Sequence, residues 1–490
     1  MARRFICKCW LVCALAVIGS ATLAAQDRTD ISSLEFHSSN AALNATFAWA
    51  KQQALSYTRP GSDSIGPWYE AALPGRNAFC MRDVSHQAQG AAALGLFAAN
   101  RNMLDRFAFS AARSRNWAGY WEIDGMGQPS SADYLSDDDF WFNLPANFDV
   151  LDAIVRMWRW TGDDAYRDDP RLREFFRKTL TDYMTQWQLQ PETILTRPRI
   201  ANRRLKEGKF VDARGIPSYS EGRKDFNVGT DLLAAEYRAI RSYQEIAASP
   251  ADKQLAERLQ KTADAIQHIL ETVAWSREQG HFNGVIQEGS RGYGSADTMV
   301  LYFGAVKDEE RMRGALDYVA NPAYWKTINI EEESYAPLVL FRYGRSDTAY
   351  HVLLDLSDPA KPRREYPEVS YAVVAGLVSG AMGVEPAGID AAYNVQSLPQ
   401  PMNKDDEQSL TSLPIGGNVL DLVQRGDTTQ HLTNRKGPVV RWKAEFPGVE
   451  QQLVANGRTV NAAHEILPGG RQISWTIVVV STGASVTVSR

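Results

Sequence analysis

Four carboxyl side chains lie where a folded chain could use them for proton transfer: Asp83, Glu122, Glu221 and Glu368. Each lies within or just after a long polar segment, and Asp83, Glu221 and Glu368 are also close to a predicted helix start. Glu122 follows an aromatic pair, and apolar neighbours raise a carboxyl pKa and keep the acid protonated. Glu368 is our first choice for a general base, and Glu221 is a general-acid candidate by position. Asp83 is equally suited to capping the free backbone N–H groups of a helix start.

The same segments combine flat aromatic rings with hydrogen-bonding groups, which suits a hydroxylated ligand such as a sugar. The chain has 13 Trp and 19 Tyr, more than a core of this size needs, although most of them are expected to fill the core. The predicted ligand-binding residues are Arg82, His86, Trp121, Trp141, Asn143, Tyr219, Glu333, Tyr335, Arg364, Glu365 and Tyr366.

Charged residues in two of these segments have simpler interpretations as well. The acids at 331–333 occupy a first helical turn, where carboxylates commonly just complement the helix dipole. Arg197, Arg199, Arg203 and Arg204 are expected to form a solvated face. If several of these arginines point inward, the leading substrate class becomes an anionic sugar such as a uronate.

Composition excludes several classes of function. The formal charge of -5 gives no basic surface for nucleic acid. The seven His show no paired metal-ligand spacing, so we expect no metal and no cofactor. The hydrophobic fraction of 44% is that of a globular protein.

Residues 1–25 are predicted to be an export signal. Arg3 and Arg4 precede the apolar run 9–21, which is too short to span a bilayer, and cleavage is expected after Ala24 or Ala25. The alternative is an uncleaved anchor. Cleavage leaves Cys80 as the single thiol, so no internal disulfide is expected. We expect a periplasmic or secreted protein without stable membrane insertion.

Hydrophobic periodicity predicts the elements that must position these side chains. The predicted helices are 41–58, 84–99, 101–114, 146–161, 170–187, 228–248, 252–274, 294–305, 307–319, 332–343, 346–357 and 367–382.

The connections between these helices alternate in length. Short links follow the even-numbered helices, such as Asn100, 249–251 and Val306, while long segments follow the odd-numbered ones. Short links favour adjacent antiparallel packing. Six such hairpins predict a mainly α fold, an (α/α)6 barrel with an inner and an outer ring. All long segments then fall at one end, over the starts of the inner helices. An irregular bundle or a solenoid is the alternative.

The sequence pattern changes in the remaining part of the chain. Residues 394–413 are polar and resemble a linker, whereas 439–446, 472–480 and 484–488 are typical of strands. We therefore predict a barrel domain over 26–390, followed over 391–490 by a linker and a small β-sandwich or β-sheet appendage. This appendage is expected to be a structural cap rather than a carbohydrate-binding unit.

Three stretches resemble the six-hairpin glycosidase superfamily, which contains glucoamylases, trehalases and bacterial α-L-rhamnosidases. Residues 148–166 end in Trp-Thr-Gly-Asp-Asp-Ala-Tyr, like a barrel helix that closes in a Thr-Gly-Asp turn. Residues 227–247, with Asp231 near their start, resemble an inner helix. Residues 366–385 resemble the last inner helix and its exit. The likeness covers roughly 40–386.

The resemblance implies a glycoside hydrolase acting on an oligo- or polysaccharide. Two carboxyl groups then flank the glycosidic bond, usually with inversion at the anomeric carbon. By position Glu368 is the base, and Glu221 or Asp83 is the acid, with Glu122 third. Two alternatives stay open: a polysaccharide lyase using His86, Tyr219 and the arginines, and a non-catalytic glycan-binding protein.

Overall fold

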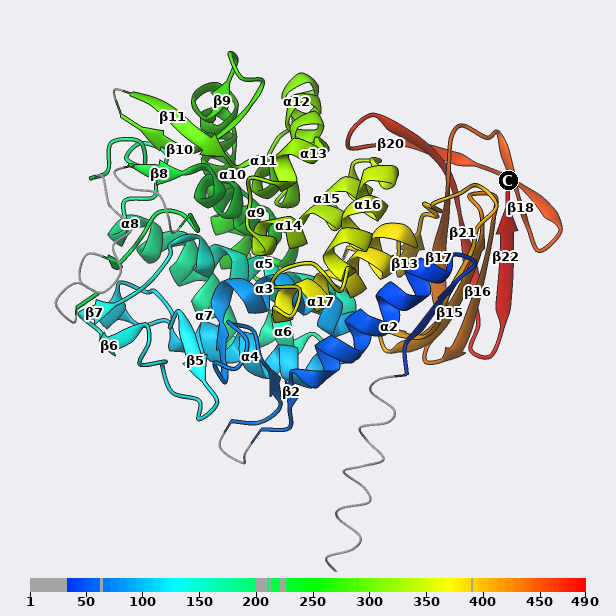
Figure 1. The fold of residues 1–490 in the computed structure, drawn as a ribbon, viewed down its shortest axis with the longest axis horizontal. Helices are drawn as coiled ribbons and strands as arrows, with labels where there is room; N and C mark the ends of the chain where they lie inside the picture. Colours follow the sequence, from blue (N-terminus) through cyan, green and yellow to red (C-terminus); the bar gives the residue numbers. More distant parts are fainter. Residues whose placement is uncertain are drawn as a thin grey trace, which may run out of the picture.

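The structure is a computed structural model that describes residues 33–61, 65–198, 209–210, 213–220, 226–288, 290–388 and 391–490. Helices make up most of the first part of the chain, and two sheets dominate its last hundred residues (Figure 1). The predicted export signal lies outside the described residues. Within the described part, no helix combines the length and apolarity needed to cross a bilayer.

Each predicted helix is present, with small differences in its ends. The helices are α2 (Ala41–Ser56), α3 (Met81–Ala93), α4 (Phe97–Ser110), α5 (Pro145–Thr161), α7 (Pro170–Lys178), α9 (Thr230–Ile246), α10 (Pro250–Ile269), α11 (Asp297–Tyr302), α12 (Glu309–Val319), α15 (Ala336–Arg342), α16 (Ser346–Ser357) and α17 (Pro367–Ala375). Five-residue π-helical turns extend α7 and α10, and a six-residue turn, Gly376–Ala381, extends α17. A short helix, α14 (Ile330–Ser334), precedes α15.

One predicted link was wrong. Asn100 was expected to join two helices, but it lies inside α4, and its side chain donates to the Ala88 carbonyl at 2.8 Å. The break falls at Gly95, whose φ of +80° suits a residue without a Cβ. At the end of α5 the prediction was confirmed, because Gly162 caps that helix in the left-handed conformation.

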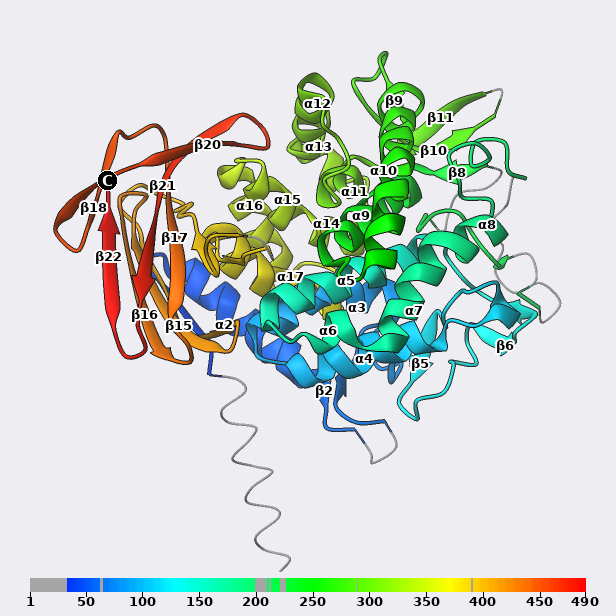
Figure 2. The same ribbon diagram turned by 180° about the vertical axis from the view of Figure 1, so that it is seen from behind.

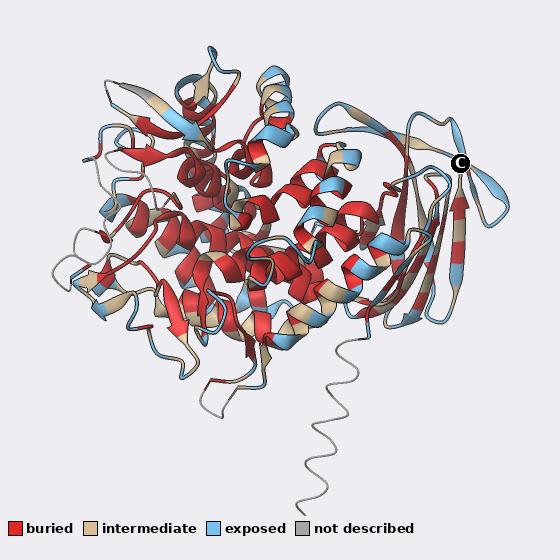
Figure 3. Ribbon diagram, in the orientation of Figure 1, coloured by how far each residue is buried: buried red, intermediate tan, exposed pale blue. Residues whose placement is uncertain are grey.

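Six helices contact one another in a cyclic order. α3 packs on α5, α5 on α9, α9 on α11, α11 on α15, α15 on α17, and α17 returns to α3. α3, α5 and α17 are buried along nearly their whole length, whereas α2, α12 and α16 bury only one side (Figure 3). The contact between α17 and α3 is close, because a Cβ on Gly90 would lie 2.1 Å from the Tyr371 carbonyl oxygen.

The long connections carry short strands. They are β2 (Thr58–Arg59), β3 (Trp68–Tyr69), β4 (Ala78–Cys80), β5 (Glu122–Asp124), β6 (Tyr134–Ser136), β7 (Asp139–Phe140), β8 (Val228–Gly229), β9 (Trp275–Ser276), β10 (His281–Gln287) and β11 (Ser290–Ser295). In Figures 1 and 2, β5 to β11 lie along the edge of the helical region that faces away from the C-terminal sheets.

The C-terminal region contains two sheets. One has the order β1-β14-β15-β16-β22-β18-β19, and the other has the order β12-β13-β17-β21-β20. The strands are β1 (Glu35–Ser38), β12 (Glu385–Pro386), β13 (Val395–Ser397), β14 (Glu407–Ile415), β15 (Asn418–Arg425), β16 (Thr429–Lys436), β17 (Val440–Pro447), β18 (Gln452–Ala455), β19 (Arg458–Asn461), β20 (Ala463–Leu467), β21 (Arg471–Val480) and β22 (Ser485–Ser489). The three predicted strands are confirmed as β17, β21 and β22.

The linker prediction for 394–413 was wrong at both ends, because β13 occupies Val395–Ser397 and β14 begins at Glu407. The sequence of β14 does not show a clear alternation of apolar and polar residues, because the polar Gln408 is buried as well as Leu410. A register shift between Leu410 and Leu413, with Ser412 at φ +60°, also breaks the pattern. On its other edge, β14 pairs with β1 from the start of the described chain.

Candidate active site

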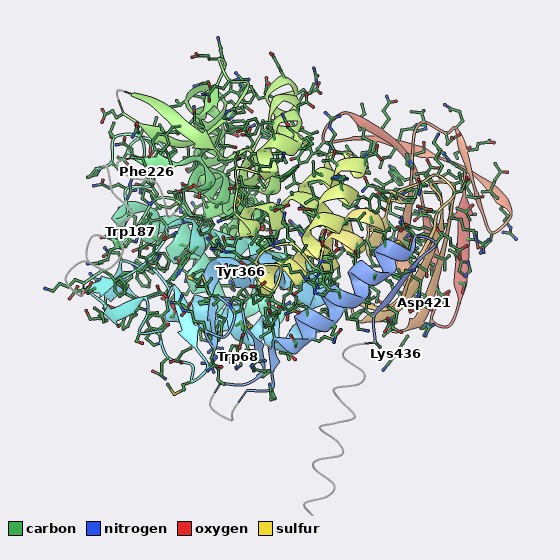
Figure 4. All side chains as sticks on the ribbon, viewed as in Figure 1. Trp68, Trp187, Phe226, Tyr366, Asp421 and Lys436 are labelled. Atoms are coloured by element: carbon green, nitrogen blue, oxygen red, sulfur yellow. The ribbon has the colours of Figure 1, made fainter. Side chains whose placement is uncertain are left out.

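A cavity of about 920 Å³ is lined by residues at the starts of α3, α9, α14 and α17 and in the long connections. It contains nine of the residues proposed from the sequence: Arg82, Asp83, Trp121, Glu122, Trp141, Tyr219, Tyr335, Tyr366 and Glu368. Figure 4 shows Tyr366, the residue before α17, near the middle of the helical region. The chain therefore gathers side chains that are far apart in sequence.

Asp83 and Glu368 occupy the first turns of two helices that pack together, α3 and α17. No side chain caps the start of α3, so Asp83 is not an N-cap. Its Oδ1 instead accepts a hydrogen bond from Arg82 Nε at 3.2 Å. Glu368 is 4% exposed, and its Oε2 has no hydrogen-bond partner among the described residues.

Burial affects both carboxyl groups, and each also senses the other. Burial raises the pKa of Asp83 to about 6, although the Arg82 guanidinium opposes this rise. Burial raises the pKa of Glu368 well above its usual range, and the nearby charge of Asp83 raises it further. Two neighbouring buried carboxyl groups cannot both ionise easily. Burial and the charge of Asp83 therefore favour the protonated form of Glu368.

Glu122 lies on β5, directly opposite Cys80, the residue before α3. Its carboxylate is 3.0 Å from Arg76 Nε, and the same guanidinium reaches Asp133 at 2.9 Å. Burial raises the pKa of Glu122 to about 6, and Arg76 opposes this rise. Glu122 is thus a third buried carboxyl group on the same cavity, but it has a cationic partner.

Asp231, in the first turn of α9, binds residues of the third long connection at the wall of the cavity. Its Oδ2 accepts from the Tyr219 backbone N–H at 2.6 Å and from Ser218 Oγ at 3.1 Å. Tyr219 in turn donates its hydroxyl to Asp149 at 3.1 Å. Burial raises the pKa of Asp149 to about 7. These bonds fix the orientation of the Tyr219 ring.

His86 supports the cavity from behind rather than lining it. Its ring stacks on Tyr335 at a centroid distance of 3.6 Å, and its Nε2 is 2.9 Å from Ser334 Oγ. Burial lowers the pKa of His86 to about 3, and Arg156 and Arg82 lower it further. The imidazole is therefore neutral at physiological pH, and its role is to hold Tyr335 in place.

Four other predicted residues do not line this cavity. Glu333 binds Lys361 at 2.8 Å, Arg364 packs over the Trp49 ring at 4.5 Å, and Glu365 is exposed. Asn143 is fully buried, and neither of its amide atoms has a partner within the described chain. Glu221, Arg199, Arg203 and Arg204 lie outside the described residues.

Several residues that line the cavity were not proposed from the sequence, notably Arg76, Asp133, Asp231, Glu331 and Glu332. Asp231 could have been found, because it occupies a first helical turn after a long polar segment, as Asp83 and Glu368 do. Glu331 could not be distinguished from Glu333 before the rotation of α14 was known. Two residues along a helix point about 200° apart.

The described lining is strongly acidic. Seven acids and three arginines face the cavity: Asp83, Glu122, Asp133, Asp231, Glu331, Glu332 and Glu368, with Arg76, Arg82 and Arg363. Arg197 does not contribute, because it is buried and donates to the Asn227 carbonyl at 3.2 Å. Across the described residues, no group of three or more His, Cys, Asp or Glu is arranged to hold a metal ion.

No known protein family matches the chain, and no curated protein is similar to it in sequence. Solved structures do resemble it. The α-L-rhamnosidase from Dictyoglumus thermophilum has a TM-score of 0.59 at 13% identity, covering 94% of this chain and 50% of that one. A family 78 rhamnosidase from Bacillus sp. GL1 has a TM-score of 0.55 at 13% identity, covering 82% and 40%.

A protein assigned as a kojibiose phosphorylase, from the human microbiome, has a TM-score of 0.55 at 9% identity, covering 96% of this chain and 70% of that one. The chain thus spans half or less of the length of the two rhamnosidases. These likenesses show that it has a six-hairpin glycosidase-like fold.

Proposed function

We propose that the protein is a glycoside hydrolase whose helical region, an (α/α)6 barrel, holds the active site at the starts of its inner helices. The cyclic order of contacts from α3 round to α17 supports the barrel. The observation that carries the proposal is the pair of buried carboxyl groups, Asp83 and Glu368, on one cavity. Such a pair can protonate a leaving oxygen and activate a water molecule.

The electrostatics favour one division of the two roles. Arg82 stays beside Asp83, so Asp83 is the member of the pair that ionises first. Glu368 is buried without a cation in contact within the described chain, and its raised pKa favours the protonated form. We therefore assign Glu368 as the general acid and Asp83 as the general base, the reverse of the role expected for Glu368 from the sequence.

In the proposed reaction Glu368 gives its proton to the glycosidic oxygen as the bond to the anomeric carbon breaks. Asp83 takes a proton from a water molecule whose oxygen attacks that carbon from the opposite face. The product has inverted configuration, and the two carboxyl groups exchange one proton through solvent before the next cycle. NMR of the first-formed anomer tests inversion.

The acidic lining favours a neutral sugar over an anionic one. Among the described lining residues, a uronate would bring its carboxylate toward seven acids and three arginines. This also disfavours the lyase alternative, which needs cations around the substrate carboxylate and an accessible base. His86, one candidate base, lies behind Tyr335. We further propose that residues 1–25 direct the enzyme to the periplasm or outside the cell.

The test is an activity screen on residues 26–490 with aryl glycosides, beginning with the α-L-rhamnoside, and with glucobioses in the presence and absence of phosphate. We expect hydrolysis of a neutral glycoside. On substrates whose leaving oxygen needs a proton, such as the glucobioses, we expect a loss of roughly 100- to 10,000-fold in kcat for Glu368→Gln and Asp83→Asn. Glu365→Gln, on an exposed neighbour, is the matched control.

Three outcomes would contradict the proposal. Phosphate-dependent cleavage would identify a phosphorylase, and an unsaturated product absorbing in the ultraviolet would identify a lyase. Binding of a glycan with no turnover in the unaltered protein would identify a binding protein.

A further inference from the structure

A second cavity, of about 240 Å³, lies between the helical region and the C-terminal sheets. Its walls include Gln89 of α3, Met157 of α5 and Ser379 of the turn after α17. Gln89 and Ser379 lie near the far ends of α3 and of the helix that continues α17, two helices whose first turns line the main cavity. We propose that this second cavity is a binding site for a small oxyanion of the phosphate or sulfate type.

The charge of the second cavity is opposite to that of the main one. Of the described residues, five arginines line it, against two glutamates: Arg156, Arg159, Arg238, Arg342 and Arg471, with Glu385 and Glu445. Guanidinium groups present several N–H donors in a planar fork, which matches the oxygen atoms of a phosphate or sulfate. The lining is therefore rich in donors for an anion.

Two of the arginines are only partly compensated by carboxylates, whereas Arg159 has a partner of its own, Glu245. Arg156 and Arg238 share a single carboxylate, Asp152, whose two oxygen atoms lie 2.9 Å and 2.7 Å from their Nε atoms. One negative charge thus serves two guanidinium groups. In addition, Arg156 Nη1 is buried and has no hydrogen-bond partner among the described residues.

The other two arginines contact neutral acceptors. Arg342 donates to the Tyr302 carbonyl at 2.6 Å, and Arg471 donates to the Gln400 side chain and to the Arg342 carbonyl. Neither forms an ion pair within the described chain. Arg342 is exposed and Arg471 is half-buried, so a solvent ion can reach both.

The two glutamates do not neutralise this excess. Glu445 shares the Lys443 ammonium with Glu465, at 2.7 Å and 2.8 Å. Glu385 accepts from Gln89 at 3.0 Å, and burial raises its pKa, which favours its uncharged form. Counted with Lys443 against Glu245, Asp152, Glu445 and Glu465, the described cluster therefore keeps about two positive charges, close to the charge that a phosphate or sulfate ion carries near neutral pH.

The position of the site suggests what the ion does. Arg342 ends α15 in the helical region, whereas Arg471 begins β21 in one of the C-terminal sheets. An oxyanion held between them would join the two regions and relieve the repulsion among the arginines. Because it binds only the folded protein, it would also stabilise the whole chain.

The experiment titrates residues 26–490 with inorganic phosphate and with sulfate by calorimetry, at constant ionic strength set with sodium chloride. Thermal unfolding is followed under the same conditions. We expect saturable binding and a rise in Tm that chloride does not produce. We also expect Arg342→Gln with Arg471→Gln to weaken binding by at least roughly tenfold, because charge-assisted hydrogen bonds are lost.

Two matched variants locate the site. Arg363→Gln removes a cation from the main cavity, and Arg425→Gln removes an exposed arginine paired with Glu407 on the sheet surface. Both should bind phosphate as the unaltered protein does. The single variant Arg342→Gln, at an exposed position, serves if the double variant does not fold.

Unchanged affinity in the folded double variant, or in the single variant used in its place, would overturn the proposal. Loss of binding in Arg363→Gln alone would move the anion to the main cavity and overturn it as well. An equal effect of chloride would show an adventitious ion only. Glycoside hydrolysis is decided by the activity screen and not by these titrations, so the two proposals fail separately.

Discussion

Asp83 and Glu368 begin two helices in contact and face one cavity, yet Asp83 alone of the two accepts a hydrogen bond from a cationic side chain, Arg82, within the described chain. This asymmetry favours a charged Asp83 and a protonated Glu368. Replacing Asp83 and replacing Glu368 should therefore have different effects on catalysis.

The first prediction separates the two roles by leaving group. In Glu368→Gln the leaving oxygen is no longer protonated, so activity should return on aryl glycosides whose phenol leaves without a proton. In Asp83→Asn the water is not activated, so these substrates should stay slow. We expect recovery of at least about tenfold for Glu368→Gln only. Recovery in Asp83→Asn instead would exchange the two assignments.

The second prediction concerns Arg82. Removing this cation in Arg82→Gln should raise the pKa of Asp83 above about 6, because its charged form loses a partner. If Asp83 is the base, the acid limb of the kcat/KM profile should then move up by about one pH unit. Arg82→Lys keeps the charge and should shift the limb less. Equal profiles in all three proteins would rule out Asp83 as the base.

The third prediction concerns stability and pH at Asp149. Burial raises its pKa from 3.8 to about 7, so between these values the unfolded chain loses a proton that the folded chain keeps. The free energy of unfolding should therefore fall as pH rises through this window, by as much as about 4 kcal/mol. Asp149→Asn should remove that part of the fall, as measured by urea unfolding at pH 4 and pH 7.5.

Glu365→Gln is the control for this comparison, because the Glu365 side chain is exposed and should not alter the slope. If Asp149→Asn unfolds with the same dependence on pH as the unaltered protein, Asp149 is ionised in the folded state.

The fourth prediction tests the close contact of α3 with α17. A methyl group at Gly90 would meet the Tyr371 carbonyl oxygen at 2.1 Å, so Gly90→Ala should lower the free energy of unfolding. Overpacking of a buried contact costs roughly 1–3 kcal/mol. Gly388→Ala meets only the Glu245 side chain at 3.3 Å and should cost less. Because α3 and α17 carry Asp83 and Glu368, kcat should fall in Gly90→Ala too.

The helices could be predicted from the sequence because each buries an apolar side and many end at a glycine or begin at a proline. Residues at helix starts, such as Asp83 and Glu368, could be predicted with them. Their meeting in one cavity followed from the alternation of short and long links. The predicted position of one break between helices was wrong. A polar residue such as Asn100 is typical of a link, but its side chain is buried and donates a hydrogen bond to the Ala88 carbonyl.

The missed residues depended on information that a pattern does not contain. Glu331 rather than Glu333 faces the cavity because of how α14 is rotated, and Lys361 holds Glu333 elsewhere. The strand β14 was missed because a bulge at Ser412 interrupts its alternation and because Gln408 is buried in it. In each case the position of the side chain depends on a residue that is distant in sequence. The periodicity of the sequence contains only local information and does not reveal such a contact.

The pairing of β1 with β14 has a consequence for dissecting the molecule. Residues 35–38 form an edge strand of a sheet built otherwise from residues after 406, so the chain is fastened near both ends. A recombinant fragment stopped at residue 390 would expose β1 as an unpaired strand next to α2, inviting association between copies. Removing either region should therefore give a product that aggregates. A circularly permuted chain that joins the two ends keeps both regions and should aggregate less.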